Sequence, residues 1–112
     1  MRELDWKVHE YMGNDLTGWE WDSESTYARF VRGTVFDYQH IPHYSTTWEG
    51  AGLIMEWLRA RDIFHDIFWN QIEQTYVSTV QLTMRGKFVK DPSAPIALCK
   101  AYISAMEERN NG

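Results

Sequence analysis

Two neighbouring strand candidates in the second half of the chain constrain its fold most. Residues 63–69 carry apolar side chains on both alternating faces, with Ile67 on one face and Phe64 and Phe68 on the other. Residues 76–84 follow a short polar connection and alternate between polar and apolar positions. Strands joined this closely are most simply antiparallel. We expect the first of them, apolar on both faces, to be covered on both sides.

Helical periodicity marks three further segments, at residues 2–12, from 45–47 to about 61, and from 93 to about 108. Thr46 is the expected N-terminal cap of the second segment, where Glu49 completes a capping box. Ser93 is the expected cap of the third segment.

The first half of the chain adds a predicted hairpin. Residues 27–32 and 34–39 are rich in aromatic and β-branched types and flank Gly33. The order of elements predicts an α+β protein of one domain, residues 1–112. Helices on both faces of a small, mainly antiparallel sheet would make a three-layer α/β/α sandwich with about three helices.

Composition excludes several classes of protein. No apolar stretch approaches the run of about 20 residues that a membrane-spanning helix needs, and the charged start predicts no signal peptide. A net charge of −5 weighs against general nucleic-acid binding, which uses a basic surface. The single cysteine, Cys99, excludes an internal disulfide and is compatible with a reducing cytoplasm.

Three stretches resemble the phage ABA sandwich domain family of small phage proteins. They are Ile-Pro-His-Tyr-Ser-Thr at 41–46, Ser-Ala-Pro-Ile-Ala-Leu-Cys-Lys-Ala at 93–101, and Tyr-Met-Gly at 11–13. The resemblance implies an α/β/α sandwich, a phage origin and the host cytoplasm; it transfers no catalytic residue, since the family carries no established activity. The chain departs from the family pattern at Thr47, where an acidic residue is frequent, and at Gly50 and Gly52, where alanines are frequent. These glycines either permit close backbone packing or are merely tolerated in the helix.

Residues with catalytic or metal-binding chemistry do not form a recognisable set. Asp37, His40 and His43 are spaced by three, but such positions point to opposite faces of an extended segment. We therefore expect no metal site and no cofactor. Cys99 falls on the apolar stripe of the last helix and is interpreted as a core residue rather than a nucleophile. The chain is expected not to be an enzyme.

Aromatic residues are frequent, with six Trp, six Tyr and five Phe. Two interpretations remain open: some rings line a binding groove or a self-association surface, or all of them cover a small core. The basic residues near the aromatic strands are either a solvated strand edge or part of a pocket for an anionic, stacked ligand. The candidate binding residues are Trp19, Trp21, Tyr27, Arg29, Arg32, Trp48, Trp57, Arg85 and Lys87.

These features favour a small, non-enzymatic phage accessory protein that binds a host or phage protein, for example to inhibit a host system such as antiviral defence. The alternative is a protein that binds or sequesters a nucleotide signal. In either case we expect a homo-oligomer, because apolar stripes on a small domain often complete their burial in a dimer. Membrane association is not expected.

Overall fold

The computed structural model describes residues 3–14, 16, 19–21, 27–32, 35–82 and 87–111. These residues form helices and strands in the order α1 (Glu3–Tyr11), β1 (Trp19–Trp21), β2 (Tyr27–Arg32), β3 (Val35–His40), α2 (Trp48–Ala60), β4 (Phe64–Asn70), β5 (Thr75–Gln81), β6 (Phe88–Asp91) and α3 (Ala94–Asn111).

The strands form two antiparallel sheets, ordered β1-β2-β3 and β4-β5-β6. The predicted α+β class, with a small antiparallel sheet and three helices, is confirmed. The predicted hairpin in the first half of the chain is confirmed as β2 and β3. Residues 88–91 add a further strand, β6, which pairs with β5.

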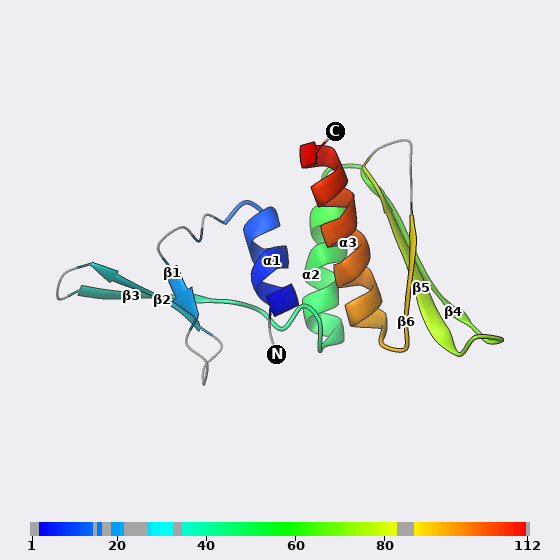
Figure 1. The fold of residues 1–112 in the computed structure, drawn as a ribbon, viewed down its shortest axis with the longest axis horizontal. Helices are drawn as coiled ribbons and strands as arrows, with labels where there is room; N and C mark the ends of the chain where they lie inside the picture. The colour runs from blue at the N-terminus through cyan, green and yellow to red at the C-terminus, as the bar shows by residue number, and fades with distance from the viewer. Residues whose placement is uncertain are drawn as a thin grey trace.

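The helices stand on one side of the β4–β6 sheet (Figure 1). α2 and α3 pack on this sheet, and α1 packs against α3 from the far side. The layers therefore run sheet, helix pair, helix, and differ in order from the expected helix, sheet, helix. The helices cover only one face of the β4–β6 sheet, so Phe64 and Phe68 on the other face of β4 remain exposed. Figure 1 places the β1–β3 sheet at the other end of the molecule, beyond α1.

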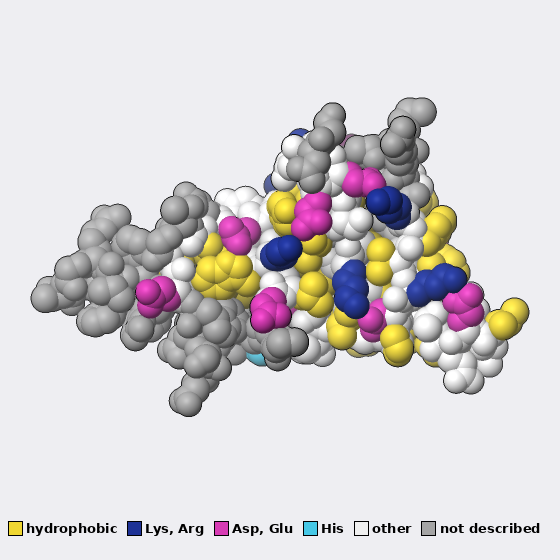
Figure 2. Space-filling view, in the orientation of Figure 1, with side chains coloured by type: hydrophobic (Ala, Val, Ile, Leu, Met, Phe, Trp, Pro, Cys, Tyr) yellow, Lys and Arg dark blue, Asp and Glu magenta, His cyan; other side chains and the backbone are white. Residues whose placement is uncertain are grey.

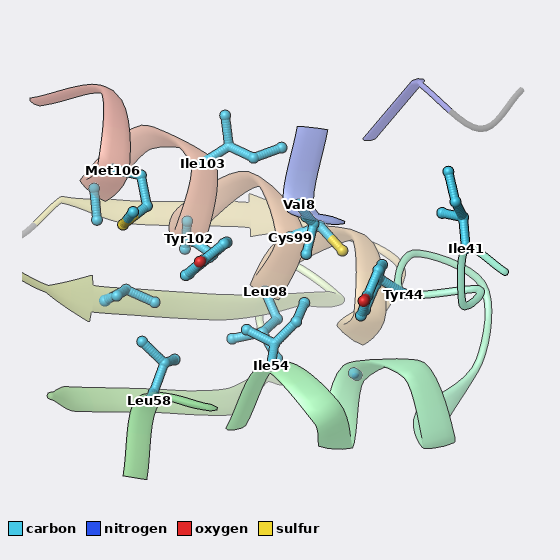
Figure 3. Packing of buried hydrophobic residues seen from close by; sticks show 14 of the residues in the cluster. Val8, Ile41, Tyr44, Ile54, Leu58, Leu98, Cys99, Tyr102, Ile103 and Met106 are labelled. Carbon is cyan, nitrogen blue, oxygen red and sulfur yellow. The ribbon is translucent and has the colours of Figure 1, made fainter. Parts of the chain in front are cut away.

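The core is built around α3 (Figure 3). Leu98, Cys99 and Tyr102 of this helix are fully buried, and α2 contributes Ile54 and Leu58 to the same cluster. Both helices present apolar positions at helical spacing, which confirms the stripes read from the sequence. Cys99 is thus a core residue, as interpreted from its place on the stripe.

The start of α2 differs from expectation by one residue. Thr47, and not Thr46, is the N-cap: its Oγ1 accepts the N–H of Gly50 at 3.0 Å and donates to the carbonyl oxygen of His43 at 2.9 Å. The turn over 43–47 brings Gly50 against the backbone of this turn, where a Cβ would overlap the carbonyl group of His43. Close packing is therefore the role of Gly50, whereas no described atom lies within 4 Å of a Cβ built on Gly52.

The start of α3 agrees with expectation. Ser93 Oγ accepts the N–H of Ile96 at 3.4 Å, and the N–H of Ser93 donates to Asp91 Oδ1 at 2.9 Å. These bonds satisfy backbone donors that the first helical turn leaves open.

Buried polar contacts join α1 to the segment that leads into α2. The N–H of Ser45 donates to Oδ1 of the fully buried Asp5 at 2.8 Å. His9 Nδ1 and Tyr44 Oη are at hydrogen-bonding distance, 2.9 Å. Burial raises the pKa of Tyr44 to about 12, with a smaller contribution from Asp5. Burial, helped by His40, lowers the pKa of His9 below its usual 6.5. The stretch at 41–46 therefore has a structural role, since it ties α1 to α2.

Candidate functional site

Large apolar side chains remain exposed on two neighbouring surfaces around the β4–β6 sheet. The first, here called the aromatic corner, consists of Trp48, Trp69, Tyr76 and the adjoining Ile72. The second, here called the phenylalanine face, consists of Phe64, Phe68 and Phe88. Figure 2 shows hydrophobic side chains gathered on the β4–β6 side of the molecule. Exposed apolar patches of this kind are typical of interaction surfaces.

The aromatic corner lies where the start of α2 meets the β4–β5 turn. Trp69 and Tyr76 are cross-strand partners with ring centroids 4.9 Å apart. Trp48, the first residue of α2, meets the ring of Tyr76 edge-on at 6.3 Å. Trp48 and Trp69 nevertheless stay 58% and 46% exposed. The ring contacts therefore position both indoles without burying them.

The turn over 71–74 holds Ile72 at its tip. Asn70 Oδ1 accepts the N–H groups of Ile72 and Glu73 at 3.0 and 3.2 Å. Lys90 of β6 donates to Glu73 Oε1 at 2.9 Å, which ties the turn to the sheet. Ile72 is 95% exposed on this hydrogen-bonded turn. An apolar side chain on an ordered turn loses little backbone freedom when a partner covers it.

The phenylalanine face is the side of the β4–β6 sheet that the helices do not cover. Phe64 and Phe68 lie on one face of β4, and the strand register places Phe88 of β6 on the same face. Their exposed fractions are 59%, 45% and 62%. On the opposite face, Ile67 and Val80 pack against the helices as part of the core.

Of the tryptophans selected from the sequence, Trp48 lies on the aromatic corner, whereas Trp57 and Trp19 make internal contacts. Trp57 Nε1 donates to the carbonyl oxygen of Met12 at 3.3 Å, and its ring meets Tyr102 edge-on at 5.4 Å. The guanidinium of Arg61 stacks 3.8 Å above the same ring. Trp19 is half-buried and packs against the core cluster.

Four of the remaining selected residues lie on the β1–β3 sheet. Tyr27, Arg29 and Arg32 lie in β2 and Trp21 in β1, at the end of the molecule opposite the β4–β6 sheet (Figure 1). Their side chains lie outside the described part of the structure, as does the whole of Arg85.

Basic residues recur over positions 85–90, here called the basic cluster. Its described lysines, Lys87 and Lys90, are both paired with carboxylates. Lys87 Nζ lies 2.9 Å from Glu108 Oε1, and Lys90 Nζ lies 2.9 Å from Glu73 Oε2. Both ion pairs are largely exposed, so each contributes at most about 1 kcal/mol. The pairing nevertheless weakens the case for an anion site here, because an anionic ligand would compete with the carboxylates for the same ammonium groups.

Cys99 is a buried residue of the core. Burial, with a contribution from Asp5, raises the pKa of Cys99 to about 12, so the thiol stays protonated at neutral pH. A hollow of 510 Å³ lies between β3 and α2, lined by His40, Pro42, His43, Thr47, Glu49, Gly50 and Leu53. Within the described ranges, no three His, Cys, Asp or Glu side chains are grouped to hold a metal ion.

Sequence reasoning missed the phenylalanine face and most of the aromatic corner. Residues 63–69 were expected to be covered on both faces, which the exposure of Phe64 and Phe68 contradicts. Asp66 was the available signal, since it lies between these two rings on the same face and a carboxylate seldom sits in an apolar layer. Trp69 carried no comparable signal, because its place beside Tyr76 and Trp48 depends on strand register and on where α2 begins.

Comparison with known proteins finds a solved structure of similar fold. That structure is the crystal structure of a phage protein from Bacillus cereus ATCC 14579, which matches with a TM-score of 0.68 at 19% sequence identity. The match covers 95% of this chain and 86% of the other. No protein-family model matches the chain, and no curated protein matches its sequence. Across the described residues, no helix combines the length and apolar character needed to cross a membrane. The chain therefore shares the α+β fold of a small phage protein, and the resemblance to the ABA sandwich family remains a prediction.

Proposed function

We propose that this is a small, non-enzymatic phage accessory protein that binds a host or phage protein through the aromatic corner. The observation that carries the proposal is the pair of indoles, Trp48 and Trp69, which are held against Tyr76 and yet remain about half exposed. Trp and Tyr are enriched among the residues that dominate binding energy at protein interfaces. Rings that are already positioned lose little conformational freedom when a partner covers them.

The fold supports a phage origin, since the chain resembles a phage protein of Bacillus cereus in structure. A phage origin would place the protein in the host cytoplasm. The role we assign to it there is inhibition of a host system such as antiviral defence. The structural use of Asp5, His9 and Cys99 supports a binding role over catalysis, since each of these groups is buried.

The side chains around the aromatic corner indicate which chemistry its partner should have. Glu49 follows Trp48, so a carboxylate borders the indoles, whereas Glu73 beside Ile72 is already paired with Lys90. The chain as a whole has a net charge of −5. We therefore expect a partner that offers an apolar cleft for the indoles and basic groups around it, because complementary charges at the rim of an interface favour association.

The test is capture of a partner from host lysate by the tagged protein, with bound proteins identified by mass spectrometry. The double variant Trp48→Ala/Trp69→Ala removes both indoles. Phe64→Ala is the matched control, because it truncates an equally exposed aromatic side chain outside the corner. Thermal unfolding of every variant establishes that the fold is intact, as expected for exposed positions.

The proposal expects the original protein and Phe64→Ala to recover the same single host or phage protein near stoichiometry. The double variant should recover at least about thirtyfold less, which corresponds to the loss of one hot spot of about 2 kcal/mol. Undiminished capture by the double variant would show that the corner is not the binding surface. An equal loss in Phe64→Ala would show that the effect is not specific to it.

A further inference from the structure

The centre of the phenylalanine face is buried, although no described helix or strand covers it. Val77 and Thr79 of the central strand β5 occupy this face, and both are buried. Phe68 is the cross-strand partner of Val77, and Phe88 is the partner of Thr79, so aromatic side chains flank these positions. Thr79 Oγ1 has no hydrogen-bond partner among the described residues. Covering the exposed rings around this centre with another apolar surface removes them from water, which favours association.

Two oppositely charged side chains lie at opposite corners of this face: Asp66, and Lys90, which also pairs with Glu73 of its own chain. The register sets Asp66, Thr79 and Phe88 in one row across the three strands. It sets Phe68, Val77 and Lys90 in the next row. The two rings therefore occupy one diagonal, and Asp66 and Lys90 occupy the other.

We infer that the phenylalanine face binds the same face of a second copy of this chain. A two-fold axis lying in the plane of the face exchanges its two charged corners. Asp66 of each copy then meets Lys90 of the other, while the rings of the two copies come together between these pairs. A surface with charge of one sign would repel its own copy, whereas this diagonal arrangement is self-complementary. The inference goes beyond the proposed function, because it concerns a different surface and a different occupant.

The exposed area suits a dimer of moderate stability. At about 200 Å² for a whole phenylalanine, the exposed parts of the three rings amount to roughly 300 Å². A standard interface buries about 800 Å² on each partner. The rings therefore supply an apolar centre, and the flanking charged and polar side chains of β4 and β6 supply the rim.

The test is sedimentation velocity of the full chain from low to high micromolar concentration. Phe88→Ser removes one ring from the centre of the interface, and Leu53→Ser is the matched control, since it removes an exposed apolar side chain of α2 outside both this face and the aromatic corner. The original protein and the control should dimerise alike. Phe88→Ser should raise the dimer dissociation constant at least about tenfold.

Charge exchange tests the geometry of the pairing. Because Lys90 also bonds Glu73 at 2.9 Å, all charge variants carry Glu73→Gln, which removes this intrachain partner. Asp66→Lys and Lys90→Asp should each weaken the dimer at least about tenfold, and the two together should restore it to near the Glu73→Gln value. Glu56→Lys, an equal change of charge on the exposed surface of α2, should leave the dimer unaffected.

Three results would overturn the inference. They are a monomer at every concentration, a dimer that Phe88→Ser does not weaken, and charge exchange that fails to restore association. A monomer that still captured its partner through the aromatic corner would overturn the dimer and leave the proposed function standing. A dimer that captured no partner would overturn the proposed function and leave the dimer standing.

Discussion

The start of α2 offers two glycine substitutions with opposite expected signs. Gly50→Ala would place a Cβ on the carbonyl group of His43 and within 2.7 Å of the Cα of Tyr44. Both contacts are backbone atoms in a turn fixed by the Asp5–Ser45 and Thr47–His43 hydrogen bonds. Overpacking such a site costs up to about 3 kcal/mol. The alanine regains about 1 kcal/mol of helix propensity, so the protein should lose about 2 kcal/mol of stability.

Gly52→Ala is the matched control two residues further along the helix. No described atom lies within 4 Å of its Cβ, so the variant should gain up to about 1 kcal/mol. Urea denaturation measures both free energies of unfolding, and Tm should fall by about 8 °C for Gly50→Ala at roughly 4 °C per kcal/mol. A Gly50→Ala protein as stable as the original would refute the reasoning. Equal destabilisation by both substitutions would refute it too, because the cost would then belong to the helix and not to the contact.

Three further predictions concern Cys99, His9 and the basic cluster. Because burial keeps the Cys99 thiol protonated, with a pKa of about 12, a thiol reagent should label native protein far more slowly than unfolded protein; rapid native labelling would contradict this. Folding lowers the pKa of His9, so its imidazole binds a proton at a higher pH in the unfolded chain than in the folded one. The free energy of unfolding should therefore fall as the pH drops below 6.5. His9→Gln should remove part of that fall. If the free energy of unfolding depended on pH identically in both proteins, the lowered pKa of His9 would not be its cause. Cyclic and linear nucleotides at millimolar concentration should leave Tm unchanged, because Lys87 and Lys90 are already paired; a rise in Tm would favour the nucleotide-binding alternative.

Local sequence signals predicted those helix boundaries that do not depend on distant parts of the chain. Gly13, with a φ of 103°, follows α1, and Ser93 caps α3, and both positions were readable from residue type alone. The choice between Thr46 and Thr47 was not local, because both carry the same hydroxyl. It depends on how the 43–47 turn packs against Gly50.

The order of the layers could not be read from alternation. Periodicity shows which side chains share a face of a strand, but not what covers that face. Phe64 and Phe68 were correctly predicted to share one face of β4. The prediction that another layer covers that face was wrong. Asp66 between them was the one residue that pointed to solvent.

The candidate site was predictable only in part, for the same reason. The aromatic surplus left open whether some rings would line a surface or all would cover the core, and Trp48, which is exposed, is among the candidate binding residues. Trp69 and Tyr76 join it through the register of β4 and β5 and the position of the start of α2, which are tertiary features. Trp57 looked equivalent in the sequence, yet its indole N–H bonds the carbonyl of Met12.

Site-specific photocrosslinking in host cells tests most directly whether the aromatic corner contacts a partner. A photoreactive amino acid replaces Ile72 at the exposed tip of the corner in one protein and Glu56 on the exposed surface of α2 in another. The account predicts one covalent adduct of defined mass from position 72, with the protein that the pull-down recovers, and none from position 56. An absence of adduct at 72, or equal adducts from both positions, would contradict it.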